Sequence, residues 1–351
     1  MPHKDLSDVP HEHLVDRAKG CLLGGAIGDA LGAPVEFMSL DDIRHKYGED
    51  GIQELDTAYG VLGTITDDTQ MTLFSAEGLI RAQVRYAHRG ICSPETVVAY
   101  AYQRWLATQG ELCNPFAVSE VARGWLCDVP ELRSRRAPGM TCLSALRVWD
   151  QNEAQNSSKG CGTVMRSAPF GFVESSSDLA ASCARITHGH IEGEASASIF
   201  AQAIRRLVLG HSLEESLTGS FDGYEDSDSA RLVRMAIALA RSGSSPIDAI
   251  RELGQGWTAD EALAVGVYAA LQAGSNFVRG ILFAVNHDGD SDSTGSICGS
   301  LIGAQFGMPC LPPEMLSQLE LRDVIEQVAE DLVTPNSELT NAEFNARYPG
   351  C

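Results

Sequence analysis

Hydrophobic residues recur at intervals of three and four over most of the chain, with polar residues between them. This spacing indicates amphipathic helices, because a half-buried strand would alternate apolar and polar positions. No two alternating runs are joined by a hairpin turn, so we expect an all-α fold. The predicted helices span residues 13–31, 69–83, 94–107, 194–209, 229–241, 259–273 and 321–332.

The polar stretches between these helices are short enough to be surface loops. The pattern therefore predicts one domain over residues 17–351, preceded by an N-terminal extension over residues 1–16. Several helix starts are well marked. Ser93-Pro94, Asn114-Pro115 and Ser245-Pro246 each place a capping residue before a proline at the first helical position.

Two rows of glycine stand out within the predicted helices. Glycine in a helix interior costs up to about 1 kcal/mol relative to alanine, so such rows need a physical reason. We expect side-chain-free stripes that let helices approach closely around a central feature; the alternative is crowded packing with no site nearby. Asp29 and the short apolar length exclude a membrane dimer motif. The rows are Gly20, Gly24, Gly28, Gly32 and Gly295, Gly299, Gly303, Gly307.

The composition of the chain argues against some classes of partner and location. The chain has 47 acidic and 26 basic residues, a net charge of −21, so we expect neither nucleic acid nor membrane as a partner. No apolar run reaches the roughly 20 residues that cross a bilayer, and the polar start does not resemble a secretory signal. The 10 cysteines are scattered without a C-x-x-C pair, as is typical of a reducing compartment. We expect a soluble, cytoplasmic protein.

The first candidate for chemistry is the acidic segment Thr66-Asp67-Asp68-Thr69, at the start of a predicted helix. Its structural alternative is a helix cap, in which Asp67 forms a capping box with Gln70 and the acidic residues favour the first turn. By itself this segment does not establish a site.

The second candidate is the segment over residues 287–294, which also begins a helix. It places Asp288, Asp290 and Asp292 at alternate positions, more negative charge than a cap requires. An EF-hand calcium loop is excluded, because the glycine at its sixth position and the glutamate at its twelfth are missing. An all-oxygen ligand set favours a hard cation, magnesium or manganese, over zinc.

Three further features accompany these segments. Glu36 supplies another carboxylate after the first glycine-rich helix. The glycine-rich stretch over residues 159–166 has backbone amides that could cradle a diphosphate, with Arg166 as a counter-charge or a buried ion-pair partner. His188 and His190 are candidates for metal binding or catalysis, although a histidine pair at a helix start is more often structural.

Taken together and in this order, the motifs resemble the ADP-ribosylglycohydrolase family, over roughly residues 18–309. The motifs are residues 24–36, 66–69, 160–166, 187–188 and 289–293. The resemblance implies a compact single-domain helical fold with a central binuclear site for two Mg²⁺, or Mn²⁺. Ser293 stands where many relatives have threonine, and Cys161 replaces a more usual polar residue.

The resemblance also implies roles for individual residues. The implied metal ligands are Glu36, Thr66, Asp67, Asp68, Asp290, Asp292 and Ser293. The implied diphosphate loop consists of Gly160, Cys161, Gly162, Thr163, Val164 and Met165, and His188 is expected against the substrate. Asp67, Asp68 and Glu36 are candidate catalytic bases, and they are not ranked.

The function that follows is hydrolysis of the bond between ADP-ribose and a protein arginine, with an ADP-ribosylated protein as substrate. Two alternatives remain open. One is hydrolysis of serine-linked ADP-ribose or of O-acetyl-ADP-ribose. The other is an immunity protein that neutralises an ADP-ribosyltransferase toxin by hydrolysis, by docking, or by both, with residues 1–16 as a docking arm.

Overall fold

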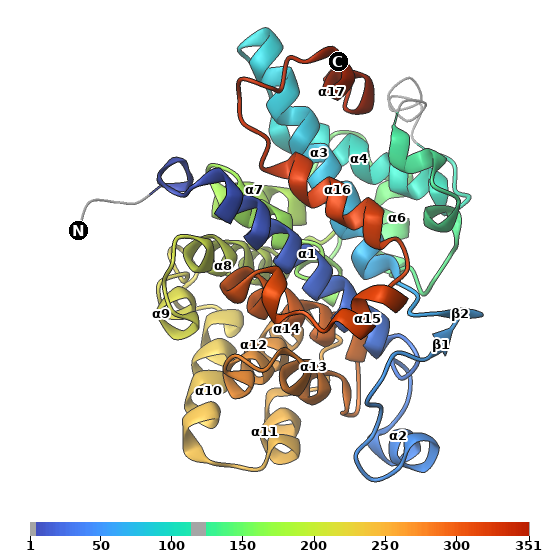
Figure 1. Cartoon of the computed structure of the whole chain (residues 1–351), viewed down its shortest axis with the longest axis vertical. Helices are drawn as coiled ribbons and strands as arrows, with labels where there is room; N and C mark the ends of the chain where they lie inside the picture. Colours follow the sequence, from blue (N-terminus) through green and yellow to red (C-terminus); the bar gives the residue numbers. More distant parts are fainter. Residues whose placement is uncertain (1–4, 114–123, 351) are drawn as a thin grey trace.

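The computed structural model describes residues 5–113 and 124–350 (Figure 1). Helices dominate this part of the chain, and its one sheet is a hairpin of β1 (Thr57–Ala58) and β2 (Val61–Leu62), so the all-α prediction is confirmed. The α-helices are α1 (His11–Gly32), α2 (Leu40–Tyr47), α3 (Asp67–Arg89), α4 (Pro94–Thr108), α6 (Met140–Val148), α7 (Ser176–Ala184), α8 (Ile191–Val208), α9 (Leu213–Thr218), α10 (Asp228–Ser242), α11 (Pro246–Leu253), α12 (Ala259–Ala273), α13 (Phe277–Val285), α14 (Ser291–Phe306), α15 (Pro313–Gln318), α16 (Arg322–Leu332) and α17 (Ala342–Arg347).

Two antiparallel helices, α1 and α14, form the centre of the fold. A Cβ atom built on Gly24 would lie 2.4 Å from the carbonyl oxygen of Gly299, and one built on Gly20 would lie 2.6 Å from that of Gly303. Such contacts leave no room for side chains between the two backbones. The close approach predicted from the glycine rows is therefore confirmed.

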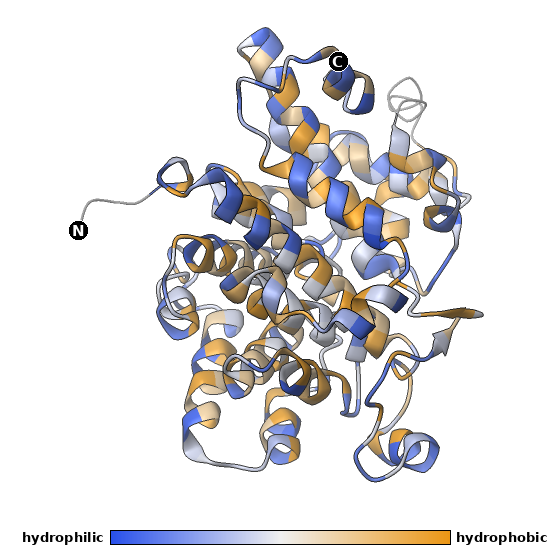
Figure 2. Ribbon diagram, viewed as in Figure 1, coloured by the Kyte–Doolittle hydropathy of each residue, from blue (hydrophilic) through white to orange (hydrophobic). Residues whose placement is uncertain are grey.

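The remaining helices cover this central pair. Residues 20–32 of α1 and residues 291–304 of α14 are buried on every side, which explains why neither helix is amphipathic. Helices α3 and α16 lie beside one part of α1, and α8, α12 and α13 pack on α14 (Figure 1). In Figure 2 hydrophobic residues dominate α12 and α13, whereas α17 at the periphery is largely hydrophilic.

Helix boundaries differ from the sequence prediction by at most three residues, except that α3 continues six residues beyond its predicted end. Helix α1 begins at His11, so residues 11–16 of the predicted extension are helical, and Asp16 accepts a hydrogen bond from the Met308 amide at 3.1 Å. Ser245 caps α11 as predicted, whereas the Ser93 hydroxyl contacts the Thr96 side chain instead of a backbone amide.

One predicted start cannot be compared, because Asn114-Pro115 lies outside the described residues. Short helices such as α9 and α15 were not predicted, since six residues are too few to show a helical period. The β1–β2 hairpin was also missed, because its strands are too short to alternate. Nine cysteines in the described chain are free thiols. No helix there has the length and apolarity to cross a bilayer.

Candidate active site

The crossing of α1 and α14 brings the two acidic segments together. At the end of the glycine row, a Cβ atom on Gly32 would lie 2.4 Å from the Asp292 amide nitrogen. The first turn of α14 therefore lies against the last turn of α1. Asp29, one turn earlier in α1, and Glu36, just after the helix, consequently face the same region as Asp292, and both have pKa values raised by its charge.

Asp29 holds the first acidic segment in place. Its buried carboxylate accepts hydrogen bonds from the Thr66 amide at 3.0 Å and the Thr66 hydroxyl at 2.8 Å, and from the Thr69 amide at 3.1 Å. Thr66 is the N-cap of α3, and its hydroxyl accepts from the Asp68 amide. The capping box of Asp67 with Gln70 is wrong, because Thr66 occupies the cap position and the Gln70 side chain instead accepts from Trp105.

An ion pair from distant parts of the chain supports the same segment. Buried Arg136 pairs with partly buried Glu320, with 2.8 Å between Nη2 and Oε1. Glu320 also accepts from the Ile65 amide at 3.2 Å, and Arg136 donates to the Ile65 carbonyl at 3.0 Å. The backbone leading into Asp67 is thus fixed from both sides.

The second acidic segment begins α14. Asp290 is the N-cap and accepts from the Ser293 amide at 3.3 Å, and Asp292 accepts from the same amide at 2.9 Å. The Asp290 and Asp292 carboxyls also contact each other. Asp288 points elsewhere and accepts from the Leu40 amide at 2.8 Å. Alternation along this segment therefore brings two of its three carboxylates into the site.

The buried acids at and around these two segments, here called the carboxylate cluster, all have raised pKa values. Burial raises the pKa of Asp29 to about 7, with the Asp292 charge as the next cause. Burial, followed by the charges of Asp292 and Asp290, raises the pKa of Glu36 to about 11. The cluster comprises Asp29, Glu36, Asp67, Asp68, Asp290 and Asp292, and burial is the largest cause of a raised pKa for each member.

The cluster fits a hard divalent cation by its donor chemistry. Glu36 Oε2 and Asp68 Oδ2 are buried and have no hydrogen-bond partner among the described residues. Carboxylate and hydroxyl oxygens are the ligands that magnesium prefers. Within residues 5–113 and 124–350 no three acidic, histidine or cysteine side chains converge as a ready-made ligand group.

The predicted diphosphate loop lies against the second acidic segment. Gly160 forms an isolated antiparallel bridge with Thr258, and the Cys161 amide donates to the Trp257 carbonyl at 3.2 Å. Residues 161–163 form a short 3-10 helix, and the Cys161 thiol contacts Asp290. The Thr163 hydroxyl is buried without a hydrogen-bond partner in the described chain. The loop and the cluster thus form one continuous surface.

His188 lies directly behind this loop. Its Nε2 is 3.4 Å from where a Cβ atom on Gly160 would be, and its ring is equally close to Gly162. Arg166 donates to the Thr187 hydroxyl at 2.7 Å, which leaves that hydroxyl free to donate to His188 Nδ1 at 2.8 Å. Burial, with the Arg166 charge second, lowers the pKa of His188 to about 3. Arg166 is therefore neither a counter-charge at the loop surface nor a partner of a carboxylate, and it orients His188 through Thr187.

The remaining residues predicted for the site, His190, Val164 and Met165, stabilise the surrounding fold. His190 is the N-cap of α8 and accepts from the Glu192 amide at 3.1 Å. Val164 is fully buried, and the Met165 carbonyl accepts from the Thr72 hydroxyl at 3.2 Å. Val164 and Met165 therefore shape the loop through their backbone, and their side chains are not exposed.

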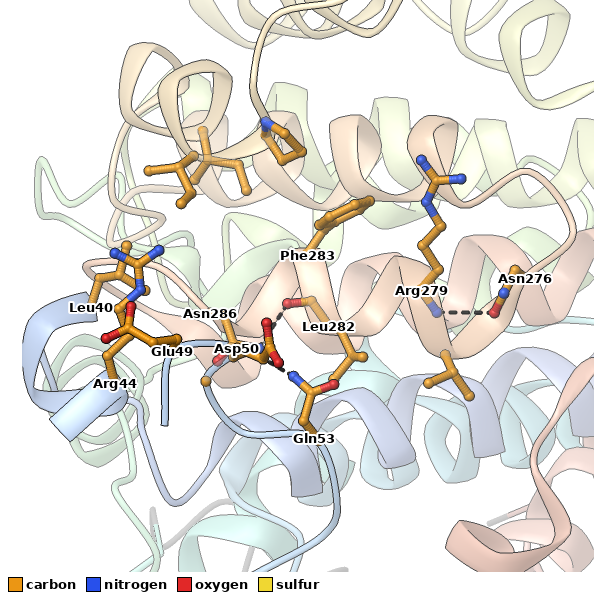
Figure 3. A pocket seen from close by; sticks show the side chains of 15 residues that line it. Leu40, Arg44, Glu49, Asp50, Gln53, Asn276, Arg279, Leu282, Phe283 and Asn286 are labelled. Atoms are coloured by element: carbon orange, nitrogen blue, oxygen red, sulfur yellow. Dashed lines mark hydrogen bonds between the residues drawn. The ribbon is translucent and has the colours of Figure 1, made fainter. Parts of the chain in front are cut away.

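Two cavities help to delimit the site. The cavity in Figure 3, of about 540 Å³, lies between α2, α11 and α13, and Arg44 and Arg279 face it from opposite sides. No member of the carboxylate cluster lines it, so it is not the reaction site. A second cavity of about 530 Å³ is lined by Asn156 and Gly189, next to His188. Asn156 donates to the Thr187 carbonyl at 2.9 Å and so connects this cavity with the His188 turn.

The sequence analysis missed two supporting groups. Asp29 is one of them: a lone carboxylate inside a glycine row signals a buried hydrogen-bond acceptor. The Arg136–Glu320 pair left no local signal, because its members are 184 positions apart in the chain. The structure brings together the segments of Glu36, Thr66, Asp67, Asp68, Gly160, Cys161, Gly162, Thr163, His188, Asp290, Asp292 and Ser293.

Comparison with known proteins gives consistent matches over nearly the whole chain. The family model described as ADP-ribosylglycohydrolase matches residues 10–341. The chain is 26% identical to an ADP-ribosyl-dinitrogen reductase glycohydrolase of Rhodospirillum rubrum, covering 88% of this chain and 91% of that protein. It is 28% identical to the ADP-ribosylarginine hydrolase Tri1 of Pseudomonas putida, covering 92% and 79%. A solved structure described as an ADP-ribosylglycohydrolase-related protein complex aligns with a TM-score of 0.64 at 26% identity, over 92% of this chain and 98% of that one.

Proposed function

This chain belongs to the ADP-ribosylglycohydrolase family, and we propose that it hydrolyses the bond between ADP-ribose and a modified arginine side chain with the help of two magnesium ions. One relative supports the acceptor, since the Tri1 protein is named an ADP-ribosylarginine hydrolase. The Rhodospirillum rubrum protein is named an ADP-ribosyl-dinitrogen reductase glycohydrolase, which supports a modified protein as substrate. The substrate would be an ADP-ribosylated protein and the product free ADP-ribose.

The observation that carries this proposal is the carboxylate cluster at the crossing of α1 and α14. Burial raises the pKa values of all six acids, and Glu36 and Asp68 each keep an oxygen without a hydrogen-bond partner in the described chain. Such a cluster is stabilised by bound cations. Glu36, Thr66, Asp67, Asp68, Asp290, Asp292 and Ser293 would hold two Mg²⁺, with Mn²⁺ as a substitute.

When bound, the two cations would supply Lewis-acid polarisation to the ribose hydroxyls and to a water molecule. The Gly160–Met165 loop would bind the diphosphate through the Gly162 and Thr163 amides, since the Cys161, Val164 and Met165 amides donate to carbonyls of the protein. Neutral His188 behind the loop would hold its shape. Water attacks the anomeric carbon through an oxocarbenium-like state, the carbon–nitrogen bond breaks, and the guanidine leaves with a proton. Glu36, Asp67 and Asp68 are the candidate acceptors for the proton of the attacking water, and bound cations would lower their raised pKa values so that they could act as bases.

The direct test is release of free ADP-ribose from an arginine-linked ADP-ribosyl protein by the purified chain, with magnesium or with EDTA. We expect release that requires magnesium. Magnesium binding measured calorimetrically, without any release from the arginine linkage, would overturn the arginine assignment and leave the metal site standing.

Two other functions remain to be separated by experiment. Serine-linked and O-acetyl-ADP-ribose substrates belong in the same assay, because a relative at 22% identity, the mouse protein ARH3, is named an ADP-ribosylhydrolase without a stated acceptor. An immunity role would require that the chain protect cells against an ADP-ribosyltransferase toxin. Its net charge of −21 favours a basic partner. Absence of both co-purification and protection would exclude this role.

A further inference from the structure

Two aromatic rings stack in solvent at the edge of the carboxylate cluster. Phe37 is 71% exposed and Trp257 is 40% exposed, and their ring centroids are 5.8 Å apart with an angle of 16° between the planes. Phe37 directly follows Glu36 in the chain. Large aromatic side chains are normally buried, so a stacked pair left in water beside buried acids suggests a surface that binds something flat.

Backbone contacts fix Trp257 against the site. Its carbonyl accepts from the Cys161 amide at 3.2 Å. A Cβ atom on the preceding Gly256 would lie 3.3 Å from the Asp290 Cβ, and the Asp290 amide donates to the Gln255 carbonyl at 2.8 Å. The stacked pair therefore joins the segment that carries Glu36 to the segment that abuts Asp290.

A third exposed aromatic residue belongs to the same edge. Tyr59 is 48% exposed and lies in the two-residue turn between β1 and β2. Its φ of 52° is the positive value that such a tight hairpin turn requires. The hairpin leads directly to Thr66. Burial, followed by the charges of Glu36 and Asp292, raises the pKa of Tyr59, so its phenol lies within the field of the cluster and stays neutral.

We propose that Phe37, Tyr59 and Trp257, here called the aromatic edge, bind the planar guanidinium cation of the arginine acceptor and so select it over neutral acceptors. This inference rests on the proposed function. Aromatic faces attract cations, whereas a neutral planar group such as a nucleobase would stack on the same rings without this attraction.

The test compares substrates that share ADP-ribose and differ in acceptor charge. For Phe37→Ala and Trp257→Ala we expect kcat/KM on an arginine-linked peptide to fall about tenfold, mainly through KM, as the loss of a cation–π contact predicts. On a serine-linked peptide the change should stay within about twofold. Phe37→Tyr and Trp257→Phe, which keep an aromatic face, should restore most of the arginine activity.

A matched control is Tyr86→Ala. Tyr86 is also an exposed aromatic residue, 63% exposed, but it lies near the far end of α3, about 28 Å along the helix from Asp67. Its removal should leave both substrates unaffected.

The outcomes separate the inference from the proposed function. An equal loss on both substrates, or weaker binding of free ADP-ribose by calorimetry, would assign the aromatic edge to the ADP-ribose part and overturn the inference alone. Unchanged kinetics in both alanine variants would overturn it as well. If the unmodified protein leaves the arginine linkage intact, the proposed function fails, and the inference fails with it.

Discussion

Gly28 of α1 and Gly295 of α14 are in backbone contact: a Cβ atom on Gly28 would lie 2.0 Å from the Gly295 carbonyl oxygen. One turn further along α1 the same packing places Gly32 against Asp292. The distance between the two helix axes therefore sets the distance between the acids that each helix carries. A change in helix packing should alter the site as well as the stability.

Gly28→Ala is expected to destabilise the protein by about 3 kcal/mol, because the obstructing atom is backbone and can move only if the helices separate. Thermal or urea unfolding measures this loss. Gly193→Ala in α8 is the matched control, since the nearest atoms to its added Cβ are side-chain atoms at 3.3 Å or more, whereas the Gly28 Cβ would overlap backbone. Equal losses in both variants would contradict the role given to the backbone contact.

Thr69→Val should reduce activity about tenfold and destabilise the protein by about 1–3 kcal/mol, because it removes a hydroxyl that donates to buried Asp29 and leaves the carboxylate under-satisfied. Thr69→Ser keeps the hydroxyl and should retain most of the activity. ADP-ribose release and thermal unfolding check both variants. If valine and serine behave alike, the hydrogen bond to Asp29 does not organise the first acidic segment.

Asp292→Asn should abolish magnesium-dependent turnover while leaving the fold intact. In EDTA the variant should melt at or above the temperature of the unmodified protein, because one of several mutually repelling buried charges has been removed. Added magnesium should raise the melting temperature of the unmodified protein only. An equal rise in the variant, or full activity, would contradict the proposed metal site.

Buried histidines should make the protein less stable in acid. Burial lowers the pKa of His188 to about 3 and that of His287 to about 4, below their unfolded values near 6.5. The unfolded chain therefore binds more protons between these values, and the stability from each histidine is lost as the pH falls. At pH 5 we expect each histidine to lower the free energy of unfolding by about 2 kcal/mol relative to pH 7.

The carboxylate cluster has raised pKa values, so its contribution to stability changes with pH in the opposite direction. The effect of the histidines therefore shows only when the unmodified chain is compared with a variant that lacks both. The difference in unfolding free energy between pH 7 and pH 5 should be smaller in His188→Gln with His287→Gln than in the unmodified chain. An identical pH dependence would mean that these histidines are already charged in the folded state.

The helices that the sequence predicted correctly are those long enough to show a period. Residues 259–273 were predicted to the residue, and α1 differs by two positions at its start and one at its end. α3 was predicted from residue 69, but it begins at Asp67, because Thr66 is held in the cap position by Asp29 from another helix. A tertiary contact therefore decided that boundary.

The sequence by itself determined the helical class, the close approach of two glycine rows, and the residue types that can hold a hard cation, since periodicity, missing side chains and oxygen donors are local properties. Only the tertiary structure decided which carboxylates meet. Asp288 turns away to Leu40, Asp29 joins the cluster, and Phe37 stacks on Trp257, 220 positions along the chain. These outcomes depend on how α1 and α14 cross and on what each loop packs against. No local pattern encodes such distances between residues far apart in sequence.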